Sequence, residues 1–307
     1  MLKQLVDRLT SVPLVGVDVG SSWIKVVELA RTEAGLTLRR WAASAISGSD
    51  ATVALRRTLD EAGISSSRAS LGLSEAGVAV RPFQFPPMPK KELASAIQLE
   101  AEQAILNGHA LRDMAIDWYT FSHSSEGIRG LLAVVPKKVL SNRLQMARAA
   151  GLRPTVVDVD SLALWNAYWV LVGSSEPASK TVLLMNVGAK TTNVVITKGP
   201  DELTLVRDFP LGAKALEQGH QDEWSAEVRD SLAYARSKGG LRVLDAVYVT
   251  GGGSGPNLIP LLRTAVPAPA TFWNPLQHLV RDETSPSVQE TVGPLLTIAI
   301  GLALRRL

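Results

Sequence analysis

Two segments far apart in this 307-residue chain repeat one pattern. Residues 14–29 read LVGVDVGSSWIKVVEL, and residues 182–196 read VLLMNVGAKTTNVVI. Each segment has a β-branched run, a polar side chain two residues before a glycine, small or hydroxylated residues, and a second β-branched run. β-Branched runs favour strands, and glycine with small polar residues favours tight turns. Both segments are therefore predicted to be strand–turn–strand hairpins, one in each half of a two-lobed fold.

The turn of the first hairpin has the composition of a phosphate-binding site. Gly20, Ser21 and Ser22 expose successive backbone N–H groups, which can form a nest for phosphate oxygens. Asp18 at the adjoining strand end could orient a magnesium ion through water. We therefore expect these four residues to bind the phosphates of a ligand and its metal ion.

Two further elements could complete such a site. In the second hairpin, Asn186, Gly188, Thr191 and Thr192 would hold the same phosphates from the opposite side. A glycine triplet, residues 251–253, leads into a predicted helix and lets a planar or anionic group approach the backbone closely. Gly251, Gly252 and Gly253 are therefore further candidate binding residues.

Between the hairpins, the pattern predicts an inserted subdomain with its own sheet. Residues 69–85 are predicted to be a strand, 90–106 a helix, 114–121 and 130–135 paired strands, and 137–150 a helix. A strand at 154–159 and a helix at 160–172 complete the first half. The second half is predicted to contain strands at 204–209, 243–250 and 270–273, helices at 212–217 and 224–238, a helix ending at 265, and a closing helix at 293–304. Strands alternating with helices predict an α/β fold with mixed sheets.

Composition excludes several classes of protein. The 32 Lys and Arg residues exceed the 29 Asp and Glu residues only slightly and are dispersed, so we expect no nucleic-acid surface. No apolar run reaches the roughly 20 residues that a membrane-spanning helix requires. The chain has no cysteine, which excludes disulfides and thiolate zinc sites. Residues 1–13 have apolar side chains at helical spacing and would either pack on their own domain or bind a membrane surface or partner.

The order of these elements resembles the plan of actin-like ATPases, and more narrowly the PilM family of type IV pilus assembly proteins. The matching segments are 16–22 with Lys25 and Glu28, 158–160, 207–212, 250–253, 273–276 and 300–305. The resemblance covers nearly the whole chain and includes shortened relatives, such as those of mannose-sensitive haemagglutinin pili. FtsA-like cell-division proteins share the fold but are longer.

The resemblance implies an α/β, actin-like (ribonuclease H-like) fold with two lobes and an FtsA-type inserted subdomain. It assigns residues 1–66 and 152–175, with a closing helix at 292–307, to the first lobe. Residues 67–151 form the inserted subdomain, and residues 176–291 form a second lobe whose outer part is reduced.

The resemblance also implies a function. PilM-like proteins bind ATP and, on the cytoplasmic side of the inner membrane, capture the N-terminal tail of the membrane protein PilN. We therefore expect ATP and Mg²⁺ as ligands, with Lys25 among the binding residues, and a PilN-like partner held by the inserted subdomain and the first lobe. The protein would be cytoplasmic and associated with the inner membrane through its partners, with a homodimer as an open alternative.

Two departures from the family pattern affect the expected chemistry. Asn186 replaces the usual aspartate of the second hairpin, and a neutral amide cannot act as a general base. Between Asp208 and Arg242 the chain has no match for the Glu-x-x-Lys element that contacts ribose and adenine in the family. Either nucleotide is held mainly by the hairpins and the glycine turn, or the chain has kept the fold and lost the ligand. We expect a weak or inactive ATPase; an active ATPase, a small-molecule kinase and a filament-forming protein are the alternatives.

Overall fold

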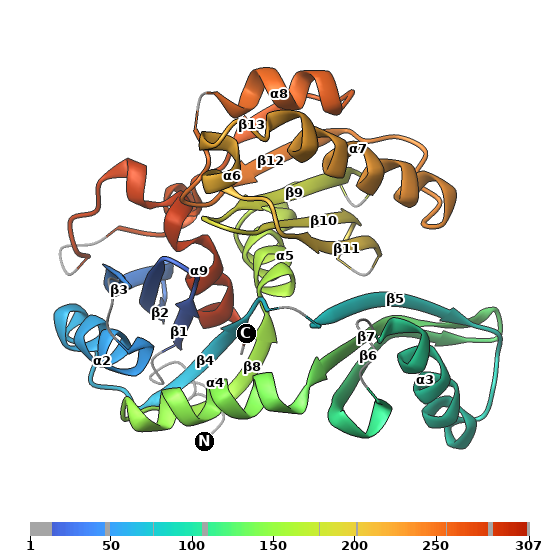
Figure 1. Cartoon of the computed structure of the whole chain (residues 1–307), viewed down its shortest axis with the longest axis horizontal. Coiled ribbons are helices and arrows are strands. Elements are labelled where there is room, and N and C mark those ends of the chain that lie inside the picture. The colour runs from blue at the N-terminus through green and yellow to red at the C-terminus, as the bar shows by residue number, and fades with distance from the viewer. Residues whose placement is uncertain are drawn as a thin grey trace.

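The computed structural model describes residues 14–46, 50–75, 77–105, 110–177, 179–200, 202–255, 257–281 and 285–305. These residues form two five-stranded sheets and one three-stranded sheet, with helices between and outside them (Figure 1). The helix predicted at residues 1–13 lies outside the described part of the chain. No helix within the described residues is long and apolar enough to cross a membrane.

The two large sheets have the same topology. The first has the order β3-β2-β1-β4-β8, with bounds Gly35–Ala45, Trp23–Thr32, Leu14–Val19, Arg68–Leu73 and Arg153–Val159. The second has the order β11-β10-β9-β12-β13, with bounds Leu203–Phe209, Thr192–Lys198, Thr181–Val187, Ala246–Thr250 and Ala270–Phe272. In each sheet the first three strands pair in antiparallel fashion. The fourth and fifth strands run parallel to the third. The two predicted hairpins, β1–β2 and β9–β10, thus occupy equivalent places in two related lobes.

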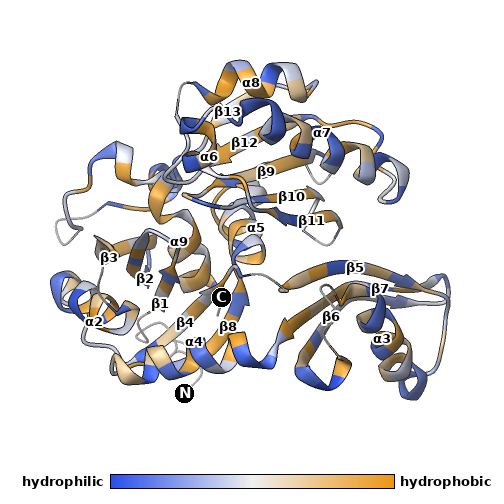
Figure 2. Cartoon of the chain, in the orientation of Figure 1, coloured by the Kyte–Doolittle hydropathy of each residue, from blue (hydrophilic) through white to orange (hydrophobic). Residues whose placement is uncertain are grey.

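Two buried helices pack between the lobes. They are α5 (Asp160–Leu171) and α9 (Thr297–Leu304), which contact each other along their lengths. All eight residues of α9 are buried, which explains why this segment is apolar on every face. Figure 2 shows hydrophobic residues concentrated in α9 and the central strands, while outer helices such as α3 and α7 carry hydrophilic residues as well.

The remaining helices cover the outer faces of the lobes. In the first lobe, α2 (Ala51–Ala62) packs on β2 and β3, and α4 (Lys137–Ala149) packs on α2 and β8. In the second lobe, α6 (Ala213–Glu217) and α8 (Leu258–Ala265) both pack against α7 (Gln221–Ser237). Each lobe is therefore a sheet between helical layers, as the α/β prediction requires.

The inserted sheet is smaller than the predicted insertion. It has the order β5-β7-β6, with bounds Ala79–Phe85, Gly127–Pro136 and Met114–Ser124, and is covered by α3 (Lys90–Ala104). The single strand predicted at 69–85 is wrong: β4 belongs to the first large sheet and β5 to the small one. The chain breaks between them near Gly77, whose φ of 86° does not fit a strand. Within residues 67–151, β4 therefore pairs in the first large sheet, while α4 packs on α2 and β8 and also on β6 and β7.

Candidate functional site

The two hairpins turn in the same way. In the first, the backbone N–H of Gly20 donates to the carbonyl oxygen of Trp23 at 3.0 Å. In the second, the N–H of Gly188 donates to the carbonyl oxygen of Thr191 at 2.9 Å. Both turns are therefore closed in the same way. A glycine N–H donates to the carbonyl oxygen of the residue three positions later.

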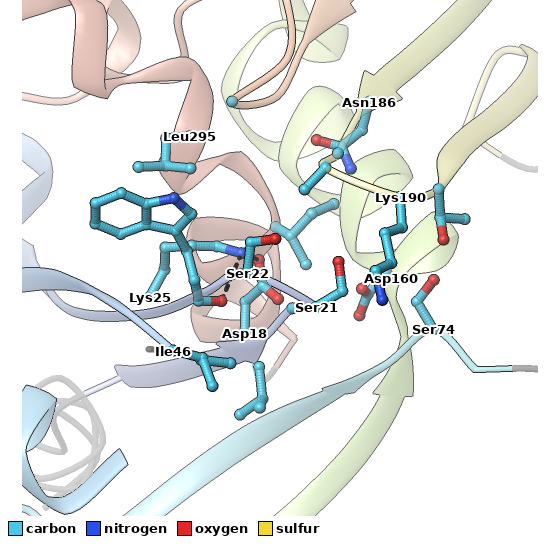
Figure 3. A pocket seen from close by; sticks show the side chains of 18 of the residues that line it. Asp18, Ser21, Ser22, Lys25, Ile46, Ser74, Asp160, Asn186, Lys190 and Leu295 are labelled. Carbon is cyan, nitrogen blue, oxygen red and sulfur yellow. Dashed lines mark hydrogen bonds and ion pairs between the residues drawn. The ribbon is translucent and has the colours of Figure 1, made fainter. Parts of the chain in front are cut away.

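These turns face a common cleft of about 750 Å³. The cleft is also lined by the first residue of α5, by one face of α4 and by the segment that precedes α9 (Figure 3). Ten of the predicted binding residues line it: Asp18, Gly20, Ser21, Ser22, Lys25, Asn186, Gly188, Thr191, Gly252 and Gly253. The structure thus brings together two hairpins that are far apart in the sequence.

The other two predicted residues do not line the cleft. The Thr192 side chain is fully buried, accepts a 3.0 Å hydrogen bond from the indole Nε1 of Trp224 and donates to the carbonyl oxygen of Leu211. Gly251 adopts a φ of 100°, and its N–H donates to the carbonyl oxygen of Pro294 at 3.1 Å. The contacts of both residues therefore lie within the fold behind the cleft.

Asp18 is held by an ion pair. Its Oδ2 lies 2.7 Å from the Nζ of Lys25, directly opposite on β2, and both side chains are largely buried. The ammonium group neutralises the carboxylate, so Asp18 would meet a metal ion through water rather than as a bare anion. Among the described residues, no three His, Asp or Glu side chains form a metal-binding cluster. A metal ion at this site would depend on the oxygens of its ligand.

The equivalent pair in the second hairpin is neutral. Asn186 donates from Nδ2 to the Oδ1 of Asn193, opposite on β10, at 2.7 Å. Asn193 lies opposite Asp208 on β11, and the hydroxyl of Ser161 on α5 donates to the Asp208 carboxyl. Burial raises the pKa of Asp208 above its ordinary value, although the Ser161 hydrogen bond opposes this. A row of buried polar groups thus extends from the cleft into the second lobe.

Asp160, at the start of α5, projects into the cleft. Its Oδ1 is buried without a hydrogen-bond partner among the described residues. Burial raises the pKa of this carboxyl well above its ordinary value, and the nearby negative charge of Asp18 raises it further. In the sequence, Asp160 belongs to the matching segment 158–160, and no binding role is predicted for it. Asp160 follows the last residue of β8 and begins α5. This position at a strand-to-helix junction could have identified it as a site residue.

Two basic residues of the cleft were not predicted. Arg143 on α4 donates from Nη1 to the carbonyl oxygen of Val19 at 3.1 Å and pairs with Glu75 at 2.9 Å. Nothing in the sequence pattern links α4 to the first hairpin, so the sequence does not identify Arg143 as a site residue. Lys190 lies in the turn of the second hairpin, is exposed and points across the cleft toward the first hairpin (Figure 3). Its position in that turn could have identified it.

The site fits a phosphate-bearing ligand. The backbone N–H groups of Ser21 and Ser22 donate to no other group within the described residues. Two buried side-chain atoms at the cleft also lack partners there: Ser22 Oγ and Asp160 Oδ1. Because buried polar atoms are almost always paired in native folds, these atoms indicate a place for water or ligand. Together with Lys25, Arg143 and Lys190, they can stabilise an anion between the lobes.

Comparison with known proteins agrees with this architecture. The family model described as "Type IV pilus assembly protein PilM" matches residues 16–238. A PilM-PilN type IV pilus biogenesis complex contains a chain that is similar at a TM-score of 0.78 and 24% identity, covering 95% of this chain and 97% of that chain.

Two more distant structures share the fold. A Bacteroides thetaiotaomicron protein with an actin-like ATPase fold and unknown function has a TM-score of 0.52 at 9% identity, over 89% of this chain and 94% of that one. The cytoplasmic domain of EpsL is also similar; EpsL is an inner membrane component of the type II secretion system of Vibrio cholerae. Its TM-score is 0.50 at 14% identity, over 93% of this chain and 94% of that one. These similarities confirm the predicted actin-like fold.

Proposed function

Because this chain belongs to the PilM family of type IV pilus assembly proteins, we propose that it is a cytoplasmic adaptor of the inner-membrane pilus assembly complex. In this role it binds the N-terminal cytoplasmic tail of a PilN-like membrane protein. It also holds ATP with Mg²⁺ in the cleft between its lobes. The observation that carries the nucleotide part is that two hairpin turns with the same geometry face one cleft.

The partner part is supported by the similar PilM-PilN complex, in which PilN is the partner of that chain. The inserted sheet offers a suitable surface for an extended tail. Its edge strand β6 pairs only with β7 among the described strands, and a free strand edge can accept a peptide as an additional strand. Trp118 and Tyr119 on β6 are 42% and 65% exposed, and exposed aromatic side chains are common anchors for peptides.

The same strand is connected to the first lobe by aromatic packing. The ring centroid of Tyr119 lies 5.4 Å from that of Phe121, which lies 6.2 Å from that of Trp165 on α5. Because α5 begins at the cleft with Asp160, one helix connects the proposed tail-binding surface to the proposed nucleotide site. This arrangement supports binding of the tail between the inserted sheet and the first lobe.

Hydrolysis of ATP is weak or absent in this proposal. A general base must accept a proton near neutral pH. Asn186 is neutral and Asp18 is paired with Lys25, so neither hairpin presents a free carboxylate as a base. When bound, Mg²⁺ would neutralise phosphate charge, while Ser21, Ser22 and Lys190 would hold the phosphate oxygens.

Calorimetry with Mg-ATP tests the nucleotide part. We expect the wild type to release heat on binding, and the Asp18→Ala and Lys190→Ala variants to bind more weakly. Because Lys190 is exposed, its substitution should leave the fold intact. Asp230→Ala, an exposed position on α7, is the matched control and should bind as the wild type does. No heat with the wild type would contradict nucleotide binding.

A labelled peptide with the N-terminal sequence of the PilN-like protein from the same genome tests the partner part. We expect saturable binding in fluorescence anisotropy and no binding of a peptide with the same residues in scrambled order. Lack of binding at high micromolar concentration would contradict this part of the proposal, whatever the result with ATP.

A further inference from the structure

Trp23 lies in the cleft with a large part of its side chain exposed. It follows the phosphate-type turn directly as the first residue of β2, lines the cleft and is 42% exposed. Its carbonyl oxygen accepts the hydrogen bond that closes the turn, and its backbone pairs with Ala45 on β3. The sheet therefore fixes the backbone of Trp23 while the indole remains in contact with the cleft.

Apolar side chains lie on one side of the cleft, next to the Asp18–Lys25 ion pair. In Figure 3, Leu295 and Ile46 border the side where Lys25 lies, whereas Lys190 and Asp160 border the other side. Leu295 packs close to the glycine turn, because a Cβ atom added to Gly252 would lie 2.7 Å from its Cδ1. A ligand that contacts both sides can place a flat apolar group against Leu295 and Ile46 and negative charge near Lys190.

Few side chains of the second lobe are available to contact such a flat group. Between β11 and β12, Ala213 is the one described residue that lines the cleft. The long helix of this region, α7, packs on the sheet and buries Trp224 completely. In the first lobe, by contrast, Trp23 is the one aromatic side chain among the described lining residues.

We propose that Trp23 stacks on the base of a bound nucleotide and so distinguishes nucleotides from other polyphosphates. This inference rests on the proposed binding of ATP in the cleft. Stacking uses the π-face that every nucleobase has, rather than the hydrogen-bonding groups at its edge. Trp23 therefore selects for the presence of a base and only weakly between adenine and guanine.

Calorimetry with two ligands separates this role from phosphate binding. Mg-ATP carries a base, whereas Mg-tripolyphosphate has the phosphate chain alone. We expect Trp23→Ala to weaken Mg-ATP binding by about five- to hundredfold, the range measured for base–aromatic stacking. Trp23→Phe keeps an aromatic ring and should stay within about threefold of the wild type. Neither variant should change the affinity for tripolyphosphate, and GTP should bind to the wild type within about tenfold of ATP.

The possible outcomes separate the stacking role of Trp23 from nucleotide binding. Unchanged ATP affinity in Trp23→Ala would overturn the role of Trp23 while leaving nucleotide binding in place. An equal loss of ATP and tripolyphosphate affinity would also overturn it, because the substitution would then have disturbed the phosphate turn. Binding of tripolyphosphate without ATP in the wild type would overturn both the stacking role and the proposed nucleotide. Trp23→Leu keeps an apolar side chain without an aromatic ring and therefore controls for lost apolar area. Its melting temperature is compared with that of Trp23→Phe.

Discussion

The Nδ2 of Asn186 donates a 2.7 Å hydrogen bond to the Oδ1 of Asn193, at the position in the second hairpin that the Asp18–Lys25 ion pair occupies in the first. In both hairpins the paired residues are directly opposite in the strand register. The two lobes therefore present the same backbone to the cleft with different chemistry, an ion pair on one side and an amide pair on the other. This difference is the structural basis for expecting weak hydrolysis.

Asn186→Asp should increase ATP hydrolysis. The substitution places a carboxylate in the second hairpin, where it can act as a general base, and such groups contribute about 100-fold or more to rates. We expect at least a tenfold increase in phosphate release under single-turnover conditions. The cost is one buried hydrogen bond to Asn193, so the free energy of unfolding should fall by about 1 kcal/mol.

Asn193→Asp is the matched control for this experiment. It introduces the same charge opposite Asn186 on the adjacent strand β10. Its rate should stay at that of the wild type. If Asn186→Asp binds Mg-ATP normally and still does not accelerate phosphate release, the missing carboxylate is not what limits hydrolysis.

Asp160 should make the protein less stable as pH rises. Burial, and then the charge of Asp18, raise the pKa of this carboxyl well above 3.8 in the folded state, while Arg143 opposes the change. The folded state therefore holds the proton more tightly than the unfolded state does. The resulting stability is complete below the unfolded-state pKa and is lost as pH rises through the folded-state pKa. Each tenfold difference in proton affinity between the two states contributes about 1.4 kcal/mol.

Asp160→Asn should remove this part of the pH dependence. The amide keeps the shape of the side chain and does not ionise, so the variant should gain stability over the wild type as pH rises above 3.8. Urea unfolding at a series of pH values measures the difference. Asp230→Asn, on the exposed face of α7, should leave the wild-type slope unchanged. Parallel slopes for the wild type and Asp160→Asn would show that Asp160 ionises normally.

Gly16→Ala should destabilise the protein severely. A Cβ atom at this position would overlap the carbonyl oxygen of Ala299 and lie 2.6 Å from the backbone nitrogen of Ala303, so α9 would have to move away from β1. Overpacking of this kind costs about 3 kcal/mol, and here backbone atoms are in the way. We expect a large drop in melting temperature. Gly255→Ala is the control, because its added Cβ would meet no atom of the described residues within 4 Å, chain neighbours aside, and its effect should be small. Equal melting temperatures for the two variants would contradict the close packing of α9.

The local parts of this fold could be predicted from sequence, whereas several boundaries and long-range contacts could not. The hairpins were predictable because strand-forming runs and glycine turns are encoded by adjacent residues. The break between β4 and β5 was missed because β-type residues continue on both sides of Gly77, and only sheet membership separates the strands. No element was predicted for β3 and α2, although both pack in the first lobe.

The same limit applies to the site. Thr192 is predicted to contact the ligand because it follows the turn. Strand alternation instead directs its side chain into the core, where its hydroxyl accepts a hydrogen bond from Trp224. Arg143 reaches Val19 across 124 residues of sequence, and no local pattern reports such a contact. Sequence therefore identified the turns that form the site, and only the structure identified the side chains that enter it from other elements.

Tyr119→Ala should weaken binding of the PilN-like tail. Tyr119 is 65% exposed on the edge strand β6, so its substitution should remove a contact to the peptide without affecting the core. Aromatic anchors at interfaces contribute about 2 kcal/mol, which predicts a loss of roughly 30-fold in affinity by fluorescence anisotropy. Tyr234→Ala is the matched control, because Tyr234 is 54% exposed on α7 in the other lobe. If the tail binds equally well to wild type and Tyr119→Ala but loses affinity for Tyr234→Ala, the tail is bound by the second lobe, and the proposed surface on β6 is wrong.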